Sequence, residues 1–261
     1  MFELDIVFRS CDKGSVHSDR GPRFIDVPKK ELVMKCFVSL LESITLVKDS
    51  SIRLWVIDDN SSEDLLSYLK IKIKEYNIEG EVLSCSGEGF NASAFDQFHL
   101  CVEKGREWVY SVEDDYLHTP QAIQVMITAA KTFSKLLNSP VAIRPDDDVF
   151  SYSFNSQHSH LPCKIYNEAG RHWRTLKSSH NTFFTHKTVL IEYWSIFATL
   201  ARFFKKLSIN EDNTINLIWS NGFCEGKIPL LSPIPTLAVH ISQNNEPIYF
   251  DYKQLWESIK V

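Results

Sequence analysis

Short apolar runs alternate with amphipathic segments through the first half of the chain, and this alternation limits the fold more than any other feature. We predict strands at 4–8, 52–57, 81–85, 108–112 and 140–144. We predict helices at 30–47, from a capping pattern at Ser61 and Asp64 to about Tyr76, at 91–105 with a glycine stop, and from Thr119-Pro120 onward. Parallel strands need long, usually helical, connections. The pattern therefore predicts a doubly wound α/β fold, with a mostly parallel sheet flanked by helices.

The second half of the chain is less regular. We expect a long apolar helix at about 187–207, a short helix near 212–219 and a strand at 235–242. The sequence contains no internal repeat, no low-complexity tract and no clear linker, and its 261 residues suit one large domain. We therefore predict that residues 1–261 form a single domain, with the second half folded onto the first.

Composition argues against several classes of protein. Hydrophobic residues make up 44% and charged residues 23%, which is ordinary for a globular domain. The net charge of −5 and the lack of a long basic run argue against tight nonspecific binding of nucleic acid. The N-terminus does not resemble a signal peptide, and no stretch approaches the roughly 20 apolar residues that span a bilayer. These features predict a soluble, cytoplasmic protein without a membrane span.

The cysteines predict no disulfide framework. They are Cys11, Cys36, Cys85, Cys101, Cys163 and Cys224, and none belongs to a C-x-x-C pair or a zinc-binding spacing. Most lie in apolar runs, which favours buried, reduced thiols.

Polar residues follow three of the predicted strands. The stretches are RSCD at 9–12, DDNSS at 58–62 and EDD at 113–115. Ligands of open α/β sheets bind outside the carboxyl ends of the strands, so we expect these residues to share one edge. Clustered carboxylates repel one another unless a cation intervenes, and oxygen ligands suit Mg²⁺ or Mn²⁺. The cluster predicts a divalent cation bridged to a nucleotide diphosphate, although each motif alone is also typical of a turn or a helix cap.

Two stretches of the second half are further candidates for binding. The segment 171–187 is rich in cations and histidines and includes Arg174; it could grip a diphosphate, clamp an acceptor or belong to a solvated loop. The RPDDDVF stretch at 144–150 is typical of a polar turn, with an acceptor-facing edge as the alternative. The loop at 10–24 contains no P-loop or G-x-G-x-x-G pattern, which disfavours a dinucleotide-binding Rossmann enzyme.

These motifs, in this order, resemble the GT-A nucleotide-sugar glycosyltransferases, in particular the family 2 type. IRLWVIDDNSSEDL resembles the second strand of that family with its acidic signature, and GFNASAFDQFHLCVEKGREWVYSVEDDYLHTP resembles its helix, fourth strand and D-x-D-type motif. NEDNTIN at 210–216 resembles the x-E-D motif at a helix start, and PIPTLAVHIS a late strand with a histidine near the metal. The resemblance covers about residues 4–242. It implies a GT-A, Rossmann-like fold with a nucleotide-sugar-binding half at 1–118 and an acceptor-binding and catalytic half at 119–261.

The resemblance also implies roles for individual residues. Donor binding falls to Arg9, Asp12, Asp58, Asp59, Asn91, Glu113 and Asp114, metal binding to Asp115 and His240, and catalysis to Asp212 as the base with Glu211 beside it. We count Arg174 of the cationic stretch with the donor-binding residues. A helix dipole at Asp212 would hold this carboxylate ionised. The first acid of the D-x-D-type motif is Glu113 rather than aspartate, so the division of labour among the three acids is open.

For two of these residues, a purely structural role stays open as the alternative. NED before an apolar segment is also typical of a helix cap, which would account for Asp212 without catalysis. A single histidine in an apolar strand is often a hydrogen-bonded core residue, which would account for His240.

The implied activity is metal-dependent, inverting transfer of a sugar from a nucleotide-sugar, with a UDP-sugar expected, to an acceptor hydroxyl. A base takes the hydroxyl proton during attack on the anomeric carbon, while Mn²⁺ or Mg²⁺ stabilises the departing diphosphate. The acceptor is a saccharide or a hydroxymethylated pyrimidine in DNA, because the compact chain also resembles bacteriophage glycosyltransferases, which act in the host cytoplasm. The alternatives are a sugar nucleotidyltransferase and a nonenzymatic nucleotide-sugar-binding module.

Overall fold

The computed structural model describes residues 1–13, 23–152, 161–223, 226–242 and 245–261. Its strands are β1 (Phe2–Ser10), β2 (Ser50–Asp58), β3 (Glu79–Ser84), β4 (Trp108–Val112), β5 (Tyr116–His118), β6 (Ala142–Ile143), β7 (Ile165–Glu168), β8 (Arg171–Leu176), β9 (Phe183–His186), β10 (Trp219–Ser220), β11 (Ile228–Ile234) and β12 (Ala238–His240). Its helices are α1 (Lys29–Thr45), α2 (Glu63–Glu75), α3 (Phe90–Glu103), α4 (Ala122–Leu137), α5 (Lys187–Glu192), α6 (Trp194–Phe203) and α7 (Tyr252–Ser258), with 3-10 turns η1 (Val149–Tyr152) and η2 (Ile215–Leu217).

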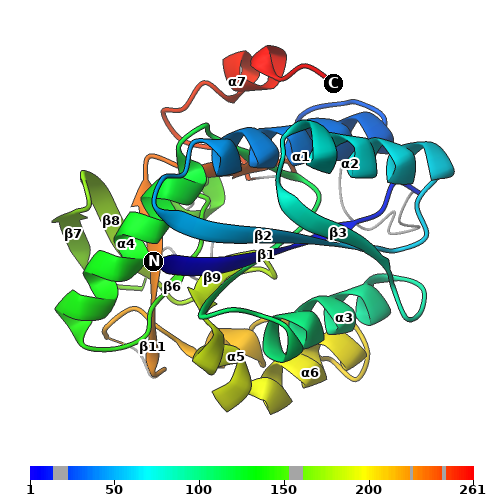
Figure 1. Ribbon diagram of the computed structural model, residues 1–261. Helices are drawn as coiled ribbons and strands as arrows, with labels where there is room; N and C mark the ends of the chain where they lie inside the picture. Colours follow the sequence, from blue (N-terminus) through cyan, green and yellow to red (C-terminus); the bar gives the residue numbers. More distant parts are fainter. Residues whose placement is uncertain (14–22, 153–160, 224–225, 243–244) are drawn as a thin grey trace.

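A large, mostly parallel sheet runs through the molecule (Figure 1). Its strand order is β3-β2-β1-β4-β9-β6-β11-β8-β7, with β10 beside β11. The pairs of β1 with β2 and β4, of β2 with β3, and of β11 with β6 and β10 are parallel. Strand β9 is antiparallel to β4 and β6, and β8 is antiparallel to β11 and β7. The sheet and its flanking helices confirm the predicted α/β fold class.

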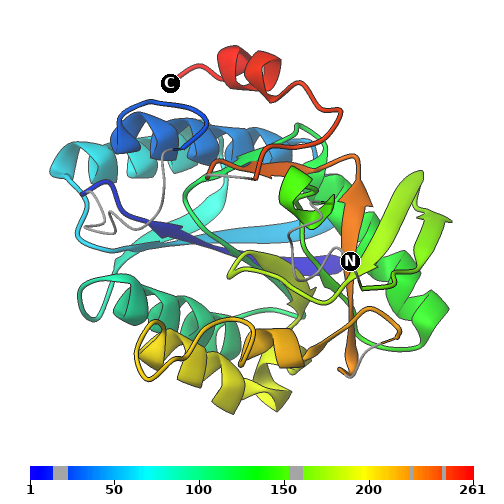
Figure 2. The ribbon, with the colours of Figure 1, turned by 180° about the vertical axis from the view of Figure 1, so that it is seen from behind.

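Alternate residues of β1 pack against different layers of helices. Ile6 and Phe8 lie in the core that contains side chains of α1, α2 and α4, whereas Val7 lies in the core that contains side chains of α3 and α6. Figures 1 and 2 show α1 and α2 over one face of the sheet and α3, α5 and α6 over the other. Because both faces are covered, most residues of the central strands are apolar, as the sequence predicts.

The helices and strands of the first half lie where periodicity predicts them, with ends that shift by a few residues. Gly105 stops α3 as expected: its amide bonds to the Leu100 carbonyl at 3.2 Å, and a Cβ would lie 2.1 Å from the Cys101 carbonyl oxygen. Two details of the prediction are wrong. Ser62, not Ser61, caps α2 by accepting from the Leu65 amide at 3.3 Å. The helix after Pro120 begins only at Ala122.

The second half differs more from the prediction. The helix expected at 187–207 is divided at Tyr193 into α5 and α6. The helix expected near 212–219 is only the 3-10 turn η2. The strand expected at 235–242 is confined to β12, which pairs with β5 outside the large sheet, and β11 before it is a strand that we did not predict. Apolar patterns show burial, but the pairing of distant segments decides which buried runs become strands.

The predictions on membranes and cysteines have mixed outcomes. No helix in the described part of the chain is long and apolar enough to cross a bilayer. The five described cysteines are free, but only Cys36 and Cys101 are buried. Cys11, Cys85 and Cys163 are partly or fully exposed because they lie in loops after strands or between them, so the expectation of burial is wrong there. Cys224 lies outside the described residues.

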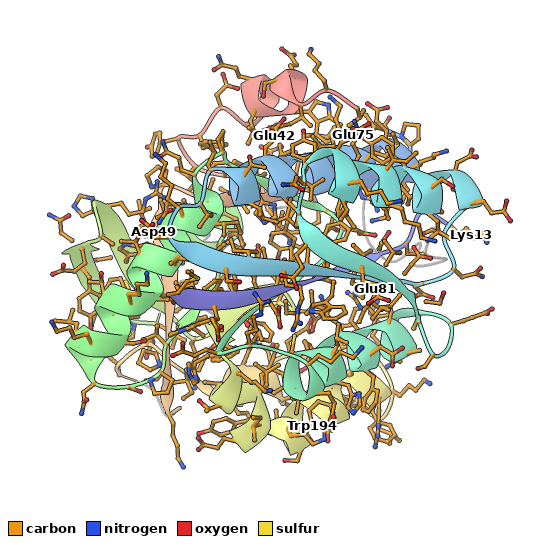
Figure 3. The ribbon with its side chains drawn as sticks, viewed as in Figure 1. Lys13, Glu42, Asp49, Glu75, Glu81 and Trp194 are labelled. Atoms are coloured by element: carbon orange, nitrogen blue, oxygen red, sulfur yellow. The ribbon has the colours of Figure 1, made fainter. Side chains whose placement is uncertain are left out.

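Parallel pairing brings the carboxyl ends of the central strands to one edge of the sheet. Ser10 of β1 stands opposite Asp58 of β2, and Phe8 stands opposite Val112 of β4. In Figure 3 Lys13, which follows β1, and Asp49, which precedes β2, lie at opposite ends of these strands. The predicted acidic motifs therefore share the edge marked by Lys13.

Candidate active site

Direct contacts tie the ends of β1 and β4 together. The Arg9 guanidinium pairs with the Glu113 carboxylate, and both residues are buried. Arg9 also lies over the ring of Phe90 at 4.4 Å, at the start of α3. Glu113 donates its backbone amide to Thr182 Oγ1 at 3.1 Å. The first acid of the EDD motif is thus neutralised by a cation of the neighbouring strand.

The second acid of the motif, Asp114, turns toward α1. Its carboxylate pairs with Lys29 and accepts a hydrogen bond from the Cys11 amide at 2.9 Å. Burial raises the pKa of Asp114, while Lys29 opposes this effect and Asp115 adds to it. These contacts join β4 to the loop after β1 and to the first turn of α1.

The third acid, Asp115, faces His240 of β12. Asp115 Oδ1 lies 3.6 Å from His240 Nε2, and both residues are buried. The ring of Tyr116 stacks on His240 at 4.5 Å, and the Asn245 amide lies 2.9 Å from Nδ1, so Nε2 is the nitrogen directed at the carboxylate. Burial lowers the pKa of His240, but the carboxylates, Asp115 foremost, outweigh it and raise the pKa above its usual value.

The pair of Asp115 and His240 can be tested against the predicted metal. Their 3.6 Å separation is longer than an ordinary hydrogen bond and suits two ligand atoms of one ion. Within the described residues, no group of three or more His, Cys, Asp or Glu side chains could hold a metal ion. Mg²⁺ commonly binds through one or two carboxylates together with substrate phosphates. The pair therefore fits a cation site that the phosphates of a donor would complete.

The acids after β1 and β2 hold loops in place. Asp12 accepts from the amide and hydroxyl of Ser62, the amide at 2.8 Å. Asp58 Oδ2 accepts from the Ser61 amide at 2.9 Å. Asp59 Oδ1 accepts from the Gly89 amide at 2.9 Å, which joins the end of β2 to the start of α3. The turn chemistry that we weighed as an alternative is thus present in this motif, at the edge where the acids meet.

Asn91 is placed apart from the acids by its contacts. Its side-chain amide donates to the Ala201 carbonyl at 2.8 Å, which ties the first turn of α3 to α6. The structure brings Arg9, Asp12, Asp58, Asp59, Glu113, Asp114 and Asp115 to one edge, whereas the amide of Asn91 points to the helical layer.

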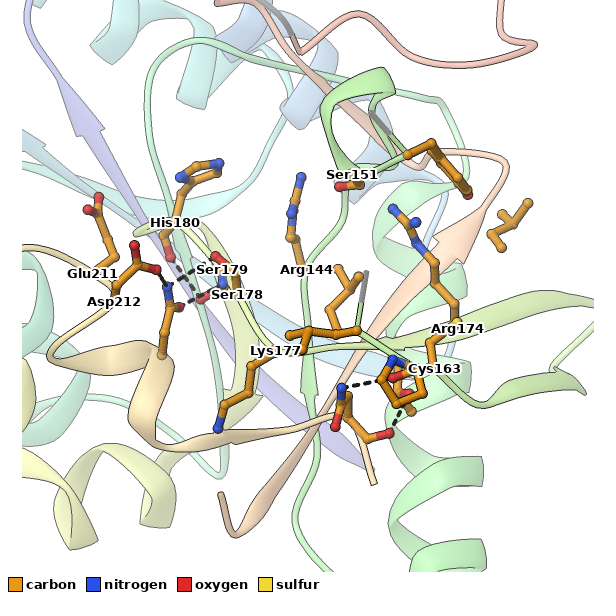
Figure 4. A pocket seen from close by; sticks show the side chains of 18 of the residues that line it. Arg144, Ser151, Cys163, Arg174, Lys177, Ser178, Ser179, His180, Glu211 and Asp212 are labelled. Carbon is orange, nitrogen blue, oxygen red and sulfur yellow. Dashed lines mark hydrogen bonds between the residues drawn. The ribbon is translucent and has the colours of Figure 1, made fainter. Parts of the chain in front are cut away.

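A cavity of about 420 Å³ is lined by His180, which contacts His240 of the pair. Its lining includes five acidic or basic side chains and one histidine: Arg144, Arg174, Lys177, Glu211, Asp212 and His180. The ring of His180 packs edge-on against His240, with 5.4 Å between ring centroids, so this residue links the cavity to the pair. Figure 4 shows Glu211, Asp212 and His180 on one side of the cavity and Arg174 on the other, with Arg144 between them.

Asp212 lies at the cavity, but not at a helix N-terminus. The residues around it form turns that lead into the three-residue η2, so the predicted helix dipole is absent from this segment and that part of the prediction is wrong. Asn216 takes over the positioning. Its Nδ2 donates to Asp212 Oδ1 at 2.9 Å and to Ser178 Oγ at 3.0 Å, while its Oδ1 accepts from the Ser179 amide at 3.0 Å.

The RPDDDVF stretch holds buried charges that the sequence did not reveal. Arg144 pairs with Asp146 and Asp148, and Arg174 Nη2 lies 2.8 Å from Asp147 Oδ1. Each of these five residues is at most 5% exposed, so the stretch is a buried ion-pair network, which the prediction of a polar turn did not anticipate. Strand β6 runs parallel to its neighbour β11 and carries this stretch at its carboxyl end. The rule that ligands bind outside the carboxyl ends of parallel strands, which located the other acids, therefore applied here too.

Burial and ion pairing act in opposite directions on these acids. Burial raises the pKa of Asp147 to about 6, although Arg174 and the Tyr152 hydroxyl work against it. Arg144 overcomes the effect of burial on Asp146 and lowers the pKa of that carboxyl. Burial also lowers the pKa of His180 to about 4, helped by Arg144 and His240. The wall of the cavity is thus an ion-pair network with a neutral histidine beside it.

Comparisons with known proteins give distant structural matches. No family model and no curated protein matches the chain. S. aureus TarS 1–349 is 11% identical, with a TM-score of 0.47, and the match covers 77% of this chain and 55% of TarS 1–349. The mannosyltransferase PcManGT from Pyrobaculum calidifontis, in complex with GDP-Man and Mn²⁺, is 10% identical, with a TM-score of 0.48 and coverage of 88% and 56%. UDP-glucose pyrophosphorylase complexed with UDP-glucose is 11% identical, with a TM-score of 0.48 and coverage of 89% and 90%.

The match spans about half the length of TarS 1–349 and of the mannosyltransferase, and 33% of the longer TarS chain. Similarities at this distance concern the arrangement of the sheet and helices. The function has to be argued from the residues of this chain.

Proposed function

We propose that the protein is a GT-A-type, metal-dependent, inverting glycosyltransferase that moves a sugar from a nucleotide-sugar, with UDP as the expected nucleotide, to an acceptor hydroxyl. One observation carries the proposal: Asp115 and His240, 125 positions apart in the sequence, face each other at 3.6 Å beside a cavity that Asp212 lines. A carboxylate–histidine pair at the carboxyl edge of an α/β sheet suits a cation and a diphosphate.

On the donor side, the loops that end β1 and β2 would hold the nucleoside. Asp12, Asp58 and Asp59 fix these loops through hydrogen bonds to Ser62, Ser61 and Gly89. Arg9 neutralises Glu113, which leaves Asp115 as the acid directed to His240. Asp115 and His240 would hold Mn²⁺ or Mg²⁺ together with the diphosphate, and the bound ion would offset the negative charge of the leaving group.

On the acceptor side, Asp212 is the proposed base. It is exposed at the cavity, and Asn216 orients its carboxylate. Glu211 lies beside it in the same lining. A positioned carboxylate that removes the acceptor proton during attack contributes roughly 10²- to 10⁴-fold to the rate. A saccharide and a hydroxymethylated pyrimidine of the kind found in phage DNA are the two acceptor classes of this proposal, with the cytoplasm as the expected location.

The proposal is tested by incubating the protein with UDP-sugars and Mn²⁺ and measuring the release of UDP. Asp115→Ala should lose metal-dependent donor binding, since it removes one of two proposed protein ligands. Asp212→Asn should bind the donor normally and lose transfer by roughly 10²-fold or more. Asp64→Asn, at an exposed carboxylate in the first turn of α2, is the matched control and should behave as the parent.

Three outcomes would count against this function. Unchanged transfer by Asp212→Asn would remove the base assignment. Release of pyrophosphate from a nucleoside triphosphate would favour a sugar nucleotidyltransferase. Tight binding of a nucleotide-sugar without any turnover would favour a nonenzymatic binding module.

A further inference from the structure

We infer that the cavity takes an uncharged, polyhydroxylated acceptor, a saccharide rather than a nucleic acid. The inference rests on the proposed function and concerns the same site. It follows from the groups on the two walls of the cavity: one wall presents hydrogen-bond donors, and the opposite wall presents carboxylates.

The wall that donates hydrogen bonds is formed by Arg174 on β8. Its guanidinium lies against Asp147 and over the ring of Tyr152 at 4.1 Å, and the residue is 5% exposed. Arg174 Nε makes no hydrogen bond to any residue that the structure describes. Arg174 nevertheless lines the cavity, and a guanidinium has N–H donors and no acceptor, so this wall favours a ligand oxygen that accepts a hydrogen bond.

The opposite wall carries Glu211 and Asp212 (Figure 4). Carboxylates accept hydrogen bonds and cannot donate. A ligand that spans the cavity must therefore accept on the Arg174 side and donate on the Asp212 side. A hydroxyl group does both, so several hydroxyls on one ring match both walls.

The balance of charge disfavours an anionic acceptor. The two guanidinium groups of Arg144 and Arg174 already face three carboxylates, those of Asp146, Asp147 and Asp148. Lys177 donates its ammonium to the Trp219 carbonyl at 2.7 Å, and Glu211 and Asp212 add negative charge. Within the described lining, the cations do not outnumber the acids around them. A phosphodiester would meet repulsion here instead of the cationic surface that nucleic acids require.

The transfer step balances without another reactant. The acceptor oxygen forms a bond to the anomeric carbon as the bond between this carbon and the diphosphate oxygen breaks. The electron pair leaves with the nucleoside diphosphate. The acceptor proton passes to the carboxylate of Asp212, whose hydrogen bond to Asn216 Nδ2 keeps it at the cavity.

The first experiment compares acceptors with the parent protein. UDP-sugars and Mn²⁺ are incubated with uncharged methyl glycosides and disaccharides, with hexose phosphates, and with a duplex containing 5-hydroxymethylcytosine. We expect uncharged glycosides to have the highest kcat/KM, with little change between about 50 and 200 mM salt, a range over which nucleic-acid binding weakens strongly. A higher kcat/KM for the duplex or the phosphates overturns the inference, as does donor hydrolysis without transfer to any uncharged glycoside.

The second experiment tests the wall at Arg174, which donates hydrogen bonds. Because Arg174→Gln alone would bury an unpaired Asp147, the double variant Asp147→Asn with Arg174→Gln replaces both charges by neutral amides. Its KM for the glycoside should rise roughly tenfold to a hundredfold, and its KM for the UDP-sugar should rise less. Arg171→Gln on the same strand, whose guanidinium bonds to the Pro235 carbonyl, is the matched control.

The experiments can refute the inference about the acceptor and the proposed function separately. A selective rise in the KM for the UDP-sugar would assign Arg174 to the diphosphate and overturn the inference, while leaving a glycosyltransferase. The absence of both donor hydrolysis and transfer with every UDP-sugar would remove the proposed function itself.

Discussion

The acids after β2 differ from those after β6 in the groups that hold them. Asp58 and Asp59 accept hydrogen bonds from the backbone amides of Ser61 and Gly89. The acids at 146–148 are held mainly by the side chains of Arg144 and Arg174, although Asp148 also accepts from the Ser151 amide. A backbone amide is present whatever the side chain, whereas each arginine can be lost by one substitution. The acids after β2 should therefore tolerate side-chain changes better than the network around Arg144.

The largest effect should come from Arg144→Met. The change leaves Asp146 and Asp148 buried without their shared cation, and breaking a buried pair in this way typically costs about 3–5 kcal/mol. Equilibrium unfolding in urea measures the loss of stability.

The comparison is sharpened by Arg53→Met in the first half. Arg53 pairs with the fully buried Asp5, but Asp5 also accepts from the Arg106 amide at 2.8 Å. A charged hydrogen bond with such support should cost about 1.5 kcal/mol. Equal losses for the two variants would contradict the contrast between the regions.

The next effect concerns His118, on β5 where the two halves meet. Burial lowers the pKa of His118 to about 3, from 6.5, and its ring contacts the Tyr110 hydroxyl at 2.8 Å. Because the folded-state pKa is depressed below the unfolded value, the neutral form stabilises the fold fully above pH 6.5. This contribution is lost as the pH falls from 6.5 toward 3, at about 1.4 kcal/mol per pH unit.

The His118 prediction is measured as a difference in unfolding free energy. His118→Gln should be less sensitive than the parent between pH 6.5 and about 4.5, because contributions from other groups cancel in the difference. His99→Gln on the exposed face of α3 is the control. If the unfolding free energies of the parent and of His118→Gln changed with pH in parallel, burial of this histidine would not account for the loss of stability in acid.

The smallest effect is expected from Asn216→Ala, which tests whether one side chain positions Asp212, the proposed base. Loss of the hydrogen bond to Asp212 should lower kcat about tenfold, equivalent to about 1.4 kcal/mol, with the donor KM unchanged. Steady-state kinetics with a UDP-sugar measure both constants. Asn213→Ala, which removes a bond to the Asn210 amide in the same loop, is the control, and an equal fall in its kcat would mean that only the loop fold matters.

Sequence patterns located the first half of the fold and much of the candidate site. Apolar runs at 52–57 and 108–112 are covered by helices on both faces, so their composition alone indicates buried parallel strands. Parallel strands end at one edge, and the acids after β1, β2 and β4 meet there as predicted. The pairing of Asp115 with His240 followed from the order of motifs, and the structure places these residues 3.6 Å apart.

The same rule applied to the position of the stretch at 144–150, but the burial and the ion pairs around Arg144 could not be inferred from sequence. Asp-rich stretches after short strands are usually turns, and β6 is only two residues long. The cost of burying Asp147 is reduced by Arg174 of β8, which lies beside it on a strand that reaches β6 through β11. The hydrogen bond by which Asn216 orients Asp212 could not be predicted from helix propensity, because η2 is a single 3-10 turn.

The sequence by itself determined the alternation of strands and helices, the shared edge of the sheet and the residue types at that edge, because periodicity and strand direction act within short segments. The tertiary structure alone decided that α5 and α6 are separate helices, that β12 leaves the large sheet to pair with β5, and that five charged residues are buried beside the cavity. These features depend on contacts between segments far apart in the chain. The free energy of burying a charge is set by the partner that the fold delivers.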